Sequence, residues 1–110
     1  MADSQHQVLD FLSHPPGKAP QRRADTHAAY AFLFPERVLK IKRAVKFPFL
    51  DYSTLEKRQA ACEAELAVNQ PYAPQIYRRV VPITEHNGAL AIGGSGKPVE
   101  WAVEMARFDE

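Results

Sequence analysis

Residues 37–74, RVLKIKRAVKFPFLDYSTLEKRQAACEAELAVNQPYAP, decide the fold of this chain. They begin with an alternating pattern that predicts a β-strand. Successive side chains of a strand point to opposite faces, so Leu39 and Ile41 would share one face while Lys40 and Lys42 share the other. The expected strand therefore has an apolar face for a core and two lysines on its opposite face.

A helix should follow, and its start is the clearest local signal in the sequence. Ser53-Thr54-Leu55-Glu56 has the form of a capping box, in which the Ser53 hydroxyl bonds one free helix amide and Glu56 reaches back to another. The helix should run to about Asn69, because Pro71 cannot continue it. Four residues lie within about 60° of one another and define the inner face: Leu55, Cys62, Leu66 and Asn69.

Two glutamates, Glu63 and Glu65, flank this inner face on opposite sides. Each lies about 80° from its centre, so helical geometry does not choose between them. Either could simply be a surface charge that pairs with Lys57 or Arg58 on the same helix. A strand lysine is likewise most often a solvated residue, so pattern alone assigns these charges no role.

The rest of the chain adds a short helix and further strands. We expect a helix over 4–13, a linker to about residue 23, strands over 28–34, 37–45, 76–84 and 99–105, and a short extra strand over 89–92. The sum is an α+β domain with an antiparallel sheet of four or five strands, one long packed helix and a short N-terminal helix. We divide the chain into a helix and linker (1–23) and one domain (24–110).

Composition narrows the classes of function. The chain has 110 residues, 45% of them hydrophobic, which is enough for one modest core. Its 14 basic and 13 acidic residues give a net charge of +1, so charge does not favour binding to nucleic acid or a membrane surface. No apolar run approaches the roughly 20 residues of a membrane span. The single cysteine, Cys62, suits a reducing compartment, so we expect a cytoplasmic protein.

Some residues that suggest chemistry have simpler interpretations. The Gly-rich segment 93–98, GGSGKP, is not a phosphate-binding P-loop, because Ala91 replaces its first glycine and Pro98 its Ser/Thr; we interpret it as a hairpin loop. The four histidines have no metal-ligand spacing with one another or with Cys62. Cys62 itself should be a small core residue.

Seven segments, in order, resemble the N-terminal part of bacterial proteins with an aminoglycoside phosphotransferase-like domain. In many of those proteins an AAA-type ATPase domain or a small-molecule-kinase-like domain follows in the same chain. The segments here are 25–27, 37–45, 47–56, 62–69, 73–74, 80–84 and 101–108. The resemblance covers nearly the whole chain and implies the smaller, N-terminal lobe of a protein-kinase-like fold.

The resemblance implies a Lys–Glu pair that handles the phosphates of ATP. Lys40 resembles the strand lysine that contacts the α- and β-phosphates, with Lys42 as the alternative. Glu65 resembles the helix glutamate that pairs with it, with Glu63 as the alternative. Such a pair orients the phosphates and offsets their charge, because phosphoryl transfer depends chiefly on positioning and electrostatics.

The resemblance also implies where the rest of the nucleotide would lie. The turn over residues 25–29, which contains His27, would cover the phosphates, and main-chain groups of Ala106 and Phe108 would face the adenine. The turn has no glycine, which makes close approach of its backbone to phosphate less favourable. His27 could also be an ordinary turn residue with local hydrogen bonds.

In such folds the larger lobe supplies the catalytic groups, most of the Mg²⁺ ligands and the contacts to the small-molecule acceptor. This chain ends at Glu110, where the hinge between lobes would begin. We therefore expect an ATP-binding lobe that does not transfer phosphoryl groups alone. It should pair with a C-terminal lobe or self-associate through exposed apolar surface. The alternative is a non-catalytic interaction or regulatory module.

Overall fold

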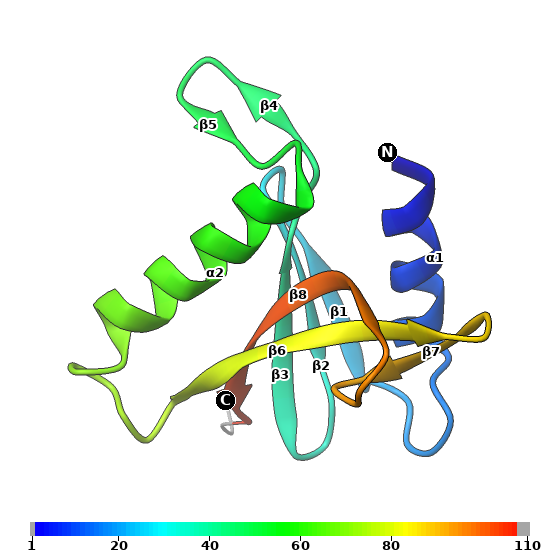
Figure 1. The fold of residues 1–110 in the computed structure, drawn as a ribbon. Coiled ribbons are helices and arrows are strands. Elements are labelled where there is room, and N and C mark those ends of the chain that lie inside the picture. Colours follow the sequence, from blue (N-terminus) through cyan, green and yellow to red (C-terminus); the bar gives the residue numbers. More distant parts are fainter. Residues whose placement is uncertain (1, 108–110) are drawn as a thin grey trace.

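The computed structural model describes residues 2–107 and has the expected α+β class (Figure 1). Its helices and strands, in chain order, are α1 (Ala2–Ser13), β1 (Arg22–Asp25), β2 (Ala29–Leu33), β3 (Arg37–Lys42), β4 (Lys46–Phe47), β5 (Leu50–Asp51), α2 (Leu55–Asn69), β6 (Tyr77–His86), β7 (Ala89–Ile92) and β8 (Lys97–Ala106).

Six strands form one curled antiparallel sheet in the order β1-β2-β3-β8-β6-β7. The small β4-β5 hairpin is a separate two-stranded sheet that projects between β3 and α2 (Figure 1). The sheet thus has one strand more than the four or five expected. The additional strand is β1, in the segment predicted as linker and turn. Its four residues are all exposed, so it has no burial pattern that a sequence could reveal.

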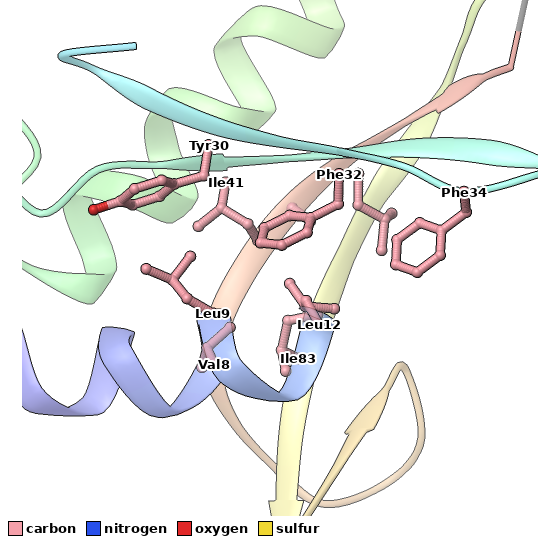
Figure 2. Packing of buried hydrophobic residues seen from close by; sticks show 10 residues of the cluster. Val8, Leu9, Leu12, Tyr30, Phe32, Phe34, Ile41 and Ile83 are labelled. Atoms are coloured by element: carbon pink, nitrogen blue, oxygen red, sulfur yellow. The ribbon is translucent and has the colours of Figure 1, made fainter. Parts of the chain in front are cut away.

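The core lies between the sheet and α1. Val8, Leu9 and Leu12 of α1 point toward a layer of strand residues (Figure 2). That layer consists of Tyr30, Phe32, Phe34, Leu39, Ile41, Ile83 and Ala102. The aromatic residues of β2 and the apolar face of β3 are therefore core, as their alternation predicts. Lys40 and Lys42 consequently face away from α1, toward α2.

Helix α2 ends at Asn69 as predicted, but its cap differs by one residue. The N-cap is Thr54, whose side chain accepts a hydrogen bond from the Lys57 amide at 3.1 Å. The Ser53 hydroxyl instead donates to Asp51 Oδ1 at 2.6 Å. The predicted capping box on Ser53 and Glu56 was therefore wrong: Asp51 Oδ1 accepts from both the hydroxyl and the amide of Ser53, at 2.6 and 3.0 Å, and this local turn places Ser53 one residue before the cap.

Two glycine-containing connections lie at the far end of the sheet. Asn87 and Gly88 both have positive φ, 52° and 82°, the conformation of a tight two-residue hairpin between β6 and β7. The Gly-rich segment then links β7 to β8, which both pair with β6. It is a loop and no helix follows it, but it is not a hairpin loop as predicted, because β7 and β8 are not neighbours.

Among the described residues no helix is long and apolar enough to cross a membrane.

Candidate functional site

The candidate site begins on β3, near the middle of the sheet. Lys40 pairs in register with Ala31 of β2 and with Val103 of β8, so its backbone is held on both sides. Lys42 pairs with Ala29, next to the β1–β2 turn. The two lysines share the sheet face that α2 crosses, and this arrangement brings them within reach of the helix.

Both lysines contact one carboxylate. The Lys40 ammonium contacts Glu65 Oε2, and the Lys42 ammonium donates to Glu65 Oε1. The prediction left Lys40 and Lys42 as alternatives, and the structure uses both. Glu63 does not take part: it is exposed and accepts a hydrogen bond from Gln59 of its own helix. The side chains of Lys42 and Glu65 are only 11% and 12% exposed, whereas Lys40 is 28% exposed and is the lysine open to a ligand.

The sequence positions Glu65 through a stripe along α2. Arg58, Cys62 and Glu65 follow one another at four and three residues, a spacing that places them on one helix face. Arg58 and Cys62 are the two buried residues of α2. The other predicted inner residues, Leu55, Leu66 and Asn69, are only half-buried. The prediction of the inner face was therefore correct at Cys62 but omitted Arg58.

The protonation states follow from this geometry. Burial would raise the pKa of Glu65, but hydrogen bonds from Lys40 and Lys42 outweigh it, and the pKa lies below its ordinary value. Burial would lower the pKa of Lys42, but its bond to Glu65 raises that pKa overall. The Lys42 ammonium also lies 5.6 Å from the centroid of the Tyr52 ring. Near neutral pH the cluster thus holds two positive charges and one negative charge.

Cys62 lies beside this cluster without joining its chemistry. Burial raises the pKa of its thiol to about 12, so it stays protonated at neutral pH. Its Sγ lies 3.9 Å from the Trp101 carbonyl oxygen, its hydrogen-bond acceptor. This agrees with the predicted role as a core residue. Among the described residues no group of three histidine, cysteine, aspartate or glutamate side chains is placed to hold a metal ion.

A shallow pocket of about 270 Å³ adjoins Lys40. It lies over β1, β2, β3 and β8, and its wall is largely apolar. The lining residues are Arg22, Ala31, Leu33, Val38, Lys40, Met105 and Arg107. Lys40 is thus a member of both the ion-pair cluster and the pocket. A flat apolar ring could occupy the pocket while an attached anion reaches the ammonium.

The remaining predicted site residues are placed as follows. The Ala106 amide already donates to the Ile76 carbonyl at 2.7 Å. Phe108 lies outside the described residues. His27 is exposed at the tip of the β1–β2 turn, with its ring 6.2 Å from that of Phe47. In that turn the Thr26 hydroxyl accepts from the amides of residues 28 and 29, at 3.3 and 3.0 Å. This side-chain cap stabilises the turn in the absence of glycine and occupies two amides that could otherwise face a phosphate.

Two further buried acids were not singled out by the sequence. Glu100 Oε1 accepts from Arg58 Nε at 2.9 Å, and Glu100 Oε2 accepts from Gln5 Nε2 at 3.0 Å. Glu104 is surrounded by Arg37, Arg78 and Arg79. The available signal in the sequence was the pair of glutamates, at 100 and 104, within the otherwise largely apolar strand VEWAVEM. In the structure this strand lies between β3 and β6.

Comparison with known proteins adds a relationship without a function. No protein-family model and no solved structure matches the chain. Curated proteins that match include uncharacterized protein Rv2004c of Mycobacterium tuberculosis (strain ATCC 25618 / H37Rv) and uncharacterized protein Mb2027c of Mycobacterium bovis (strain ATCC BAA-935 / AF2122/97). Each is 33% identical over 84 residues, which are 76% of this chain but 15% of the relative. The chain therefore spans about 15% of the length of these curated relatives.

Proposed function

We propose that this chain is the nucleotide-binding lobe of an ATP-dependent small-molecule phosphotransferase of the aminoglycoside phosphotransferase-like type, with a protein-kinase-like N-terminal lobe. One observation carries the proposal: Glu65 holds both strand lysines beside an apolar pocket that Lys40 also lines. The curated relatives are several times longer, which leaves room in such proteins for a second lobe.

The electrostatics of the cluster favour a polyanion. Two ammonium groups share one carboxylate, so within residues 2–107 one positive charge of the cluster lacks a counter-charge. A triphosphate would supply this counter-charge. Before the nucleotide binds, Glu65 would hold the two lysines in place. Mg²⁺, carried by ATP, would neutralise further phosphate charge, and its ligands would come mainly from a larger lobe. The base would lie in the pocket beside Lys40.

The proposal differs from the resemblance in how the base and phosphates are held. The Ala106 amide could reach a base only by giving up the Ile76 carbonyl. Apolar contacts from Val38 and Met105 would therefore hold the base. The turn at His27, whose amides bond Thr26, would contribute less to phosphate binding than a glycine-rich turn.

A titration of the chain with Mg-ATP, followed by amide NMR shifts, tests the proposal. We expect weak binding, with a Kd on the order of 1 mM, because only one wall of the cleft is present. Lys40→Ala should weaken it roughly tenfold or more, since a hydrogen bond to a charged group contributes about 1.5–3 kcal/mol. Lys97→Ala removes the same charge from an exposed position at the far end of β8 and should have little effect. Equal binding by both variants, or none by the wild type, would contradict the proposal.

The alternative is a non-catalytic interaction module, and one observation favours it. Large apolar side chains are exposed at Phe49 (80%), Val68 (64%) and Tyr72 (88%). Sedimentation of the wild type against a Val68→Ser/Tyr72→Ser variant separates the two functions. Self-association that this variant abolishes, together with no response to Mg-ATP, would favour the module. A wild type that stays monomeric at high concentration and binds nucleotide would exclude it.

A further inference from the structure

Helix α2 is fastened to the sheet mainly by polar contacts. Of its fifteen residues only Arg58 and Cys62 are buried. Glu65 adds the contact with the two lysines. Helices usually dock through an apolar stripe, which is tolerant of small shifts. A helix held by directional hydrogen bonds and ion pairs has its position set by those partners.

Glu100 of β8 is the junction of this arrangement. It is fully buried, and its two carboxylate oxygens face different helices. Oε1 accepts from Arg58 of α2 at 2.9 Å and from the Trp101 amide at 3.1 Å. Oε2 accepts from Gln5 of α1 at 3.0 Å. Arg58 and Gln5 are each 5% exposed, so these bonds form away from solvent. One carboxylate thereby links the two helices through the sheet.

Gln5 is also bonded to the strand that carries the lysines. Its Nε2 donates to the Lys42 carbonyl at 2.8 Å, and its Oε1 accepts from the Ala44 amide at 2.9 Å. A single side chain of α1 therefore fixes the end of β3 and one oxygen of Glu100. The backbone of Lys42 bonds to α1, while its ammonium bonds to Glu65 of α2.

We propose that Gln5 is a positioning residue for the Lys40–Glu65–Lys42 cluster, acting through Glu100 and Arg58. Arg58 and Glu65 lie seven residues apart on α2, about 10 Å along its axis and nearly on one face. Loss of the Gln5 amide frees Glu100 Oε2 and the end of β3 together. The Arg58–Glu100 pair then resettles, α2 moves with it, and Glu65 no longer reaches both lysines. The N-terminal helix thus adjusts the site from the opposite face of the sheet.

The test compares two changes in α1. Gln5→Met keeps the side-chain size but removes all three hydrogen bonds. Leu12→Ala removes core packing from the same helix, at a residue that is fully buried and bonds none of these groups. The readout is the titration of the Glu65 carboxyl by ¹³C NMR, which needs no nucleotide. The charged or titratable groups around Glu65 are Lys40, Lys42 and Cys62.

We expect Gln5→Met to raise the pKa of Glu65 toward its ordinary value, because contact with the lysines is what lowers it. Leu12→Ala should leave that pKa unchanged while lowering the melting temperature at least as much. An unchanged pKa in Gln5→Met, or an equal rise in Leu12→Ala, would overturn the proposal. If Gln5→Met does not fold, Gln5→Ser applies the same test, because serine leaves room for water at the Lys42 carbonyl yet cannot reach Glu100.

The effect of Gln5→Met on ligand binding rests on the proposed function and is measured separately from the Glu65 titration. Gln5→Met should weaken Mg-ATP binding about tenfold, as misplacement of one charged contact does. A shifted Glu65 titration with unchanged nucleotide binding would retain the positioning role and count against the nucleotide site. An unshifted titration would refute the positioning role whatever the nucleotide does.

Discussion

Replacing Glu65 by glutamine should destabilise the fold by about 2 kcal/mol at neutral pH. The side chain keeps its shape but loses the charge that two ammonium groups contact. Breaking a fully buried ion pair costs about 3–5 kcal/mol, and exposed pairs contribute about 0–1 kcal/mol. Glu65 is nearly buried at 12% exposed, but Lys40 at 28% retains access to water. An intermediate value of about 2 kcal/mol follows, which corresponds to roughly 8 °C in melting temperature for a chain of this size.

The effect should depend on pH with a definite sign. Because the folded-state pKa of Glu65 is lowered, its stabilisation is fully present above the unfolded pKa of about 4.3. The stabilisation is lost as the pH falls through the folded pKa. Wild type and Glu65→Gln should therefore differ at pH 7 and converge as the pH drops below about 4.

Urea unfolding followed by circular dichroism at several pH values measures this difference. Glu63→Gln is the matched control, because Glu63 is exposed and bonds only Gln59 among the contacts described. It should change stability by less than about 0.5 kcal/mol. The reasoning would be refuted if the two variants had equal stability at pH 7, or if the loss in Glu65→Gln were the same at pH 7 and pH 3.

Three further outcomes follow from local contacts. Thr54→Ala should lower stability by about 1 kcal/mol through loss of the helix cap, whereas Ser53→Ala should cost less than about 0.5 kcal/mol; chemical unfolding compares them. Cys62 should react with a thiol reagent at neutral pH only as fast as the protein opens, so its rate should rise with urea in step with unfolding. Glu104→Gln should cost roughly 1–2 kcal/mol, because a buried carboxylate loses charged hydrogen bonds to arginines, while the exposed Glu85→Gln should be nearly neutral in thermal unfolding.

The sequence predicted those features that depend on local periodicity. Alternation in β3 separated Leu39 and Ile41 from the lysines, and the proline after α2 marked the helix end. Strand β1 could not be predicted in this way, because its exposed residues bury no face. Its position is set by backbone pairing with β2, as between Arg22 and Leu33. The cap register failed because Asp51, a residue outside the predicted motif, accepts from the hydroxyl and the amide of Ser53 and forms a turn there.

The candidate site, too, could be predicted only as far as local periodicity allows. Helix geometry alone left Glu63 and Glu65 equivalent, and only the placement of α2 on the sheet distinguishes them. One contact that holds α2 on the sheet joins Arg58 to Glu100, which are 42 residues apart in the chain. No periodic pattern records such a pair. The sharing of Glu65 by Lys40 and Lys42 was also not predicted, although two residues along a strand span only about 7 Å and long side chains can converge over that distance.

Glu65, Glu100 and Glu104 differ in how their charge is balanced, and this difference favours the Glu65 cluster as the proposed ligand site. Glu100 and Arg58 form a one-to-one pair with both side chains buried, as expected of a structural contact. Glu104 meets several arginines, of which Arg79 is 64% exposed and solvated. At Glu65 the surplus is the Lys40 ammonium, which is partly withdrawn from water, with its side chain 28% exposed. Desolvation of such a charge costs free energy and does not stabilise the fold.

Lys40→Met should therefore leave the fold as stable as the wild type, or more stable by up to about 1 kcal/mol. Lys42 remains to pair with Glu65, and the methionine side chain fits the apolar wall of the pocket. The same variant should bind Mg-ATP at least tenfold more weakly, because it lacks the ammonium of a residue that lines the pocket. Denaturation and nucleotide titration of one sample measure both quantities. A marked loss of stability would show that Lys40 is a structural partner of Glu65, and its exposure beside the pocket would then require no ligand.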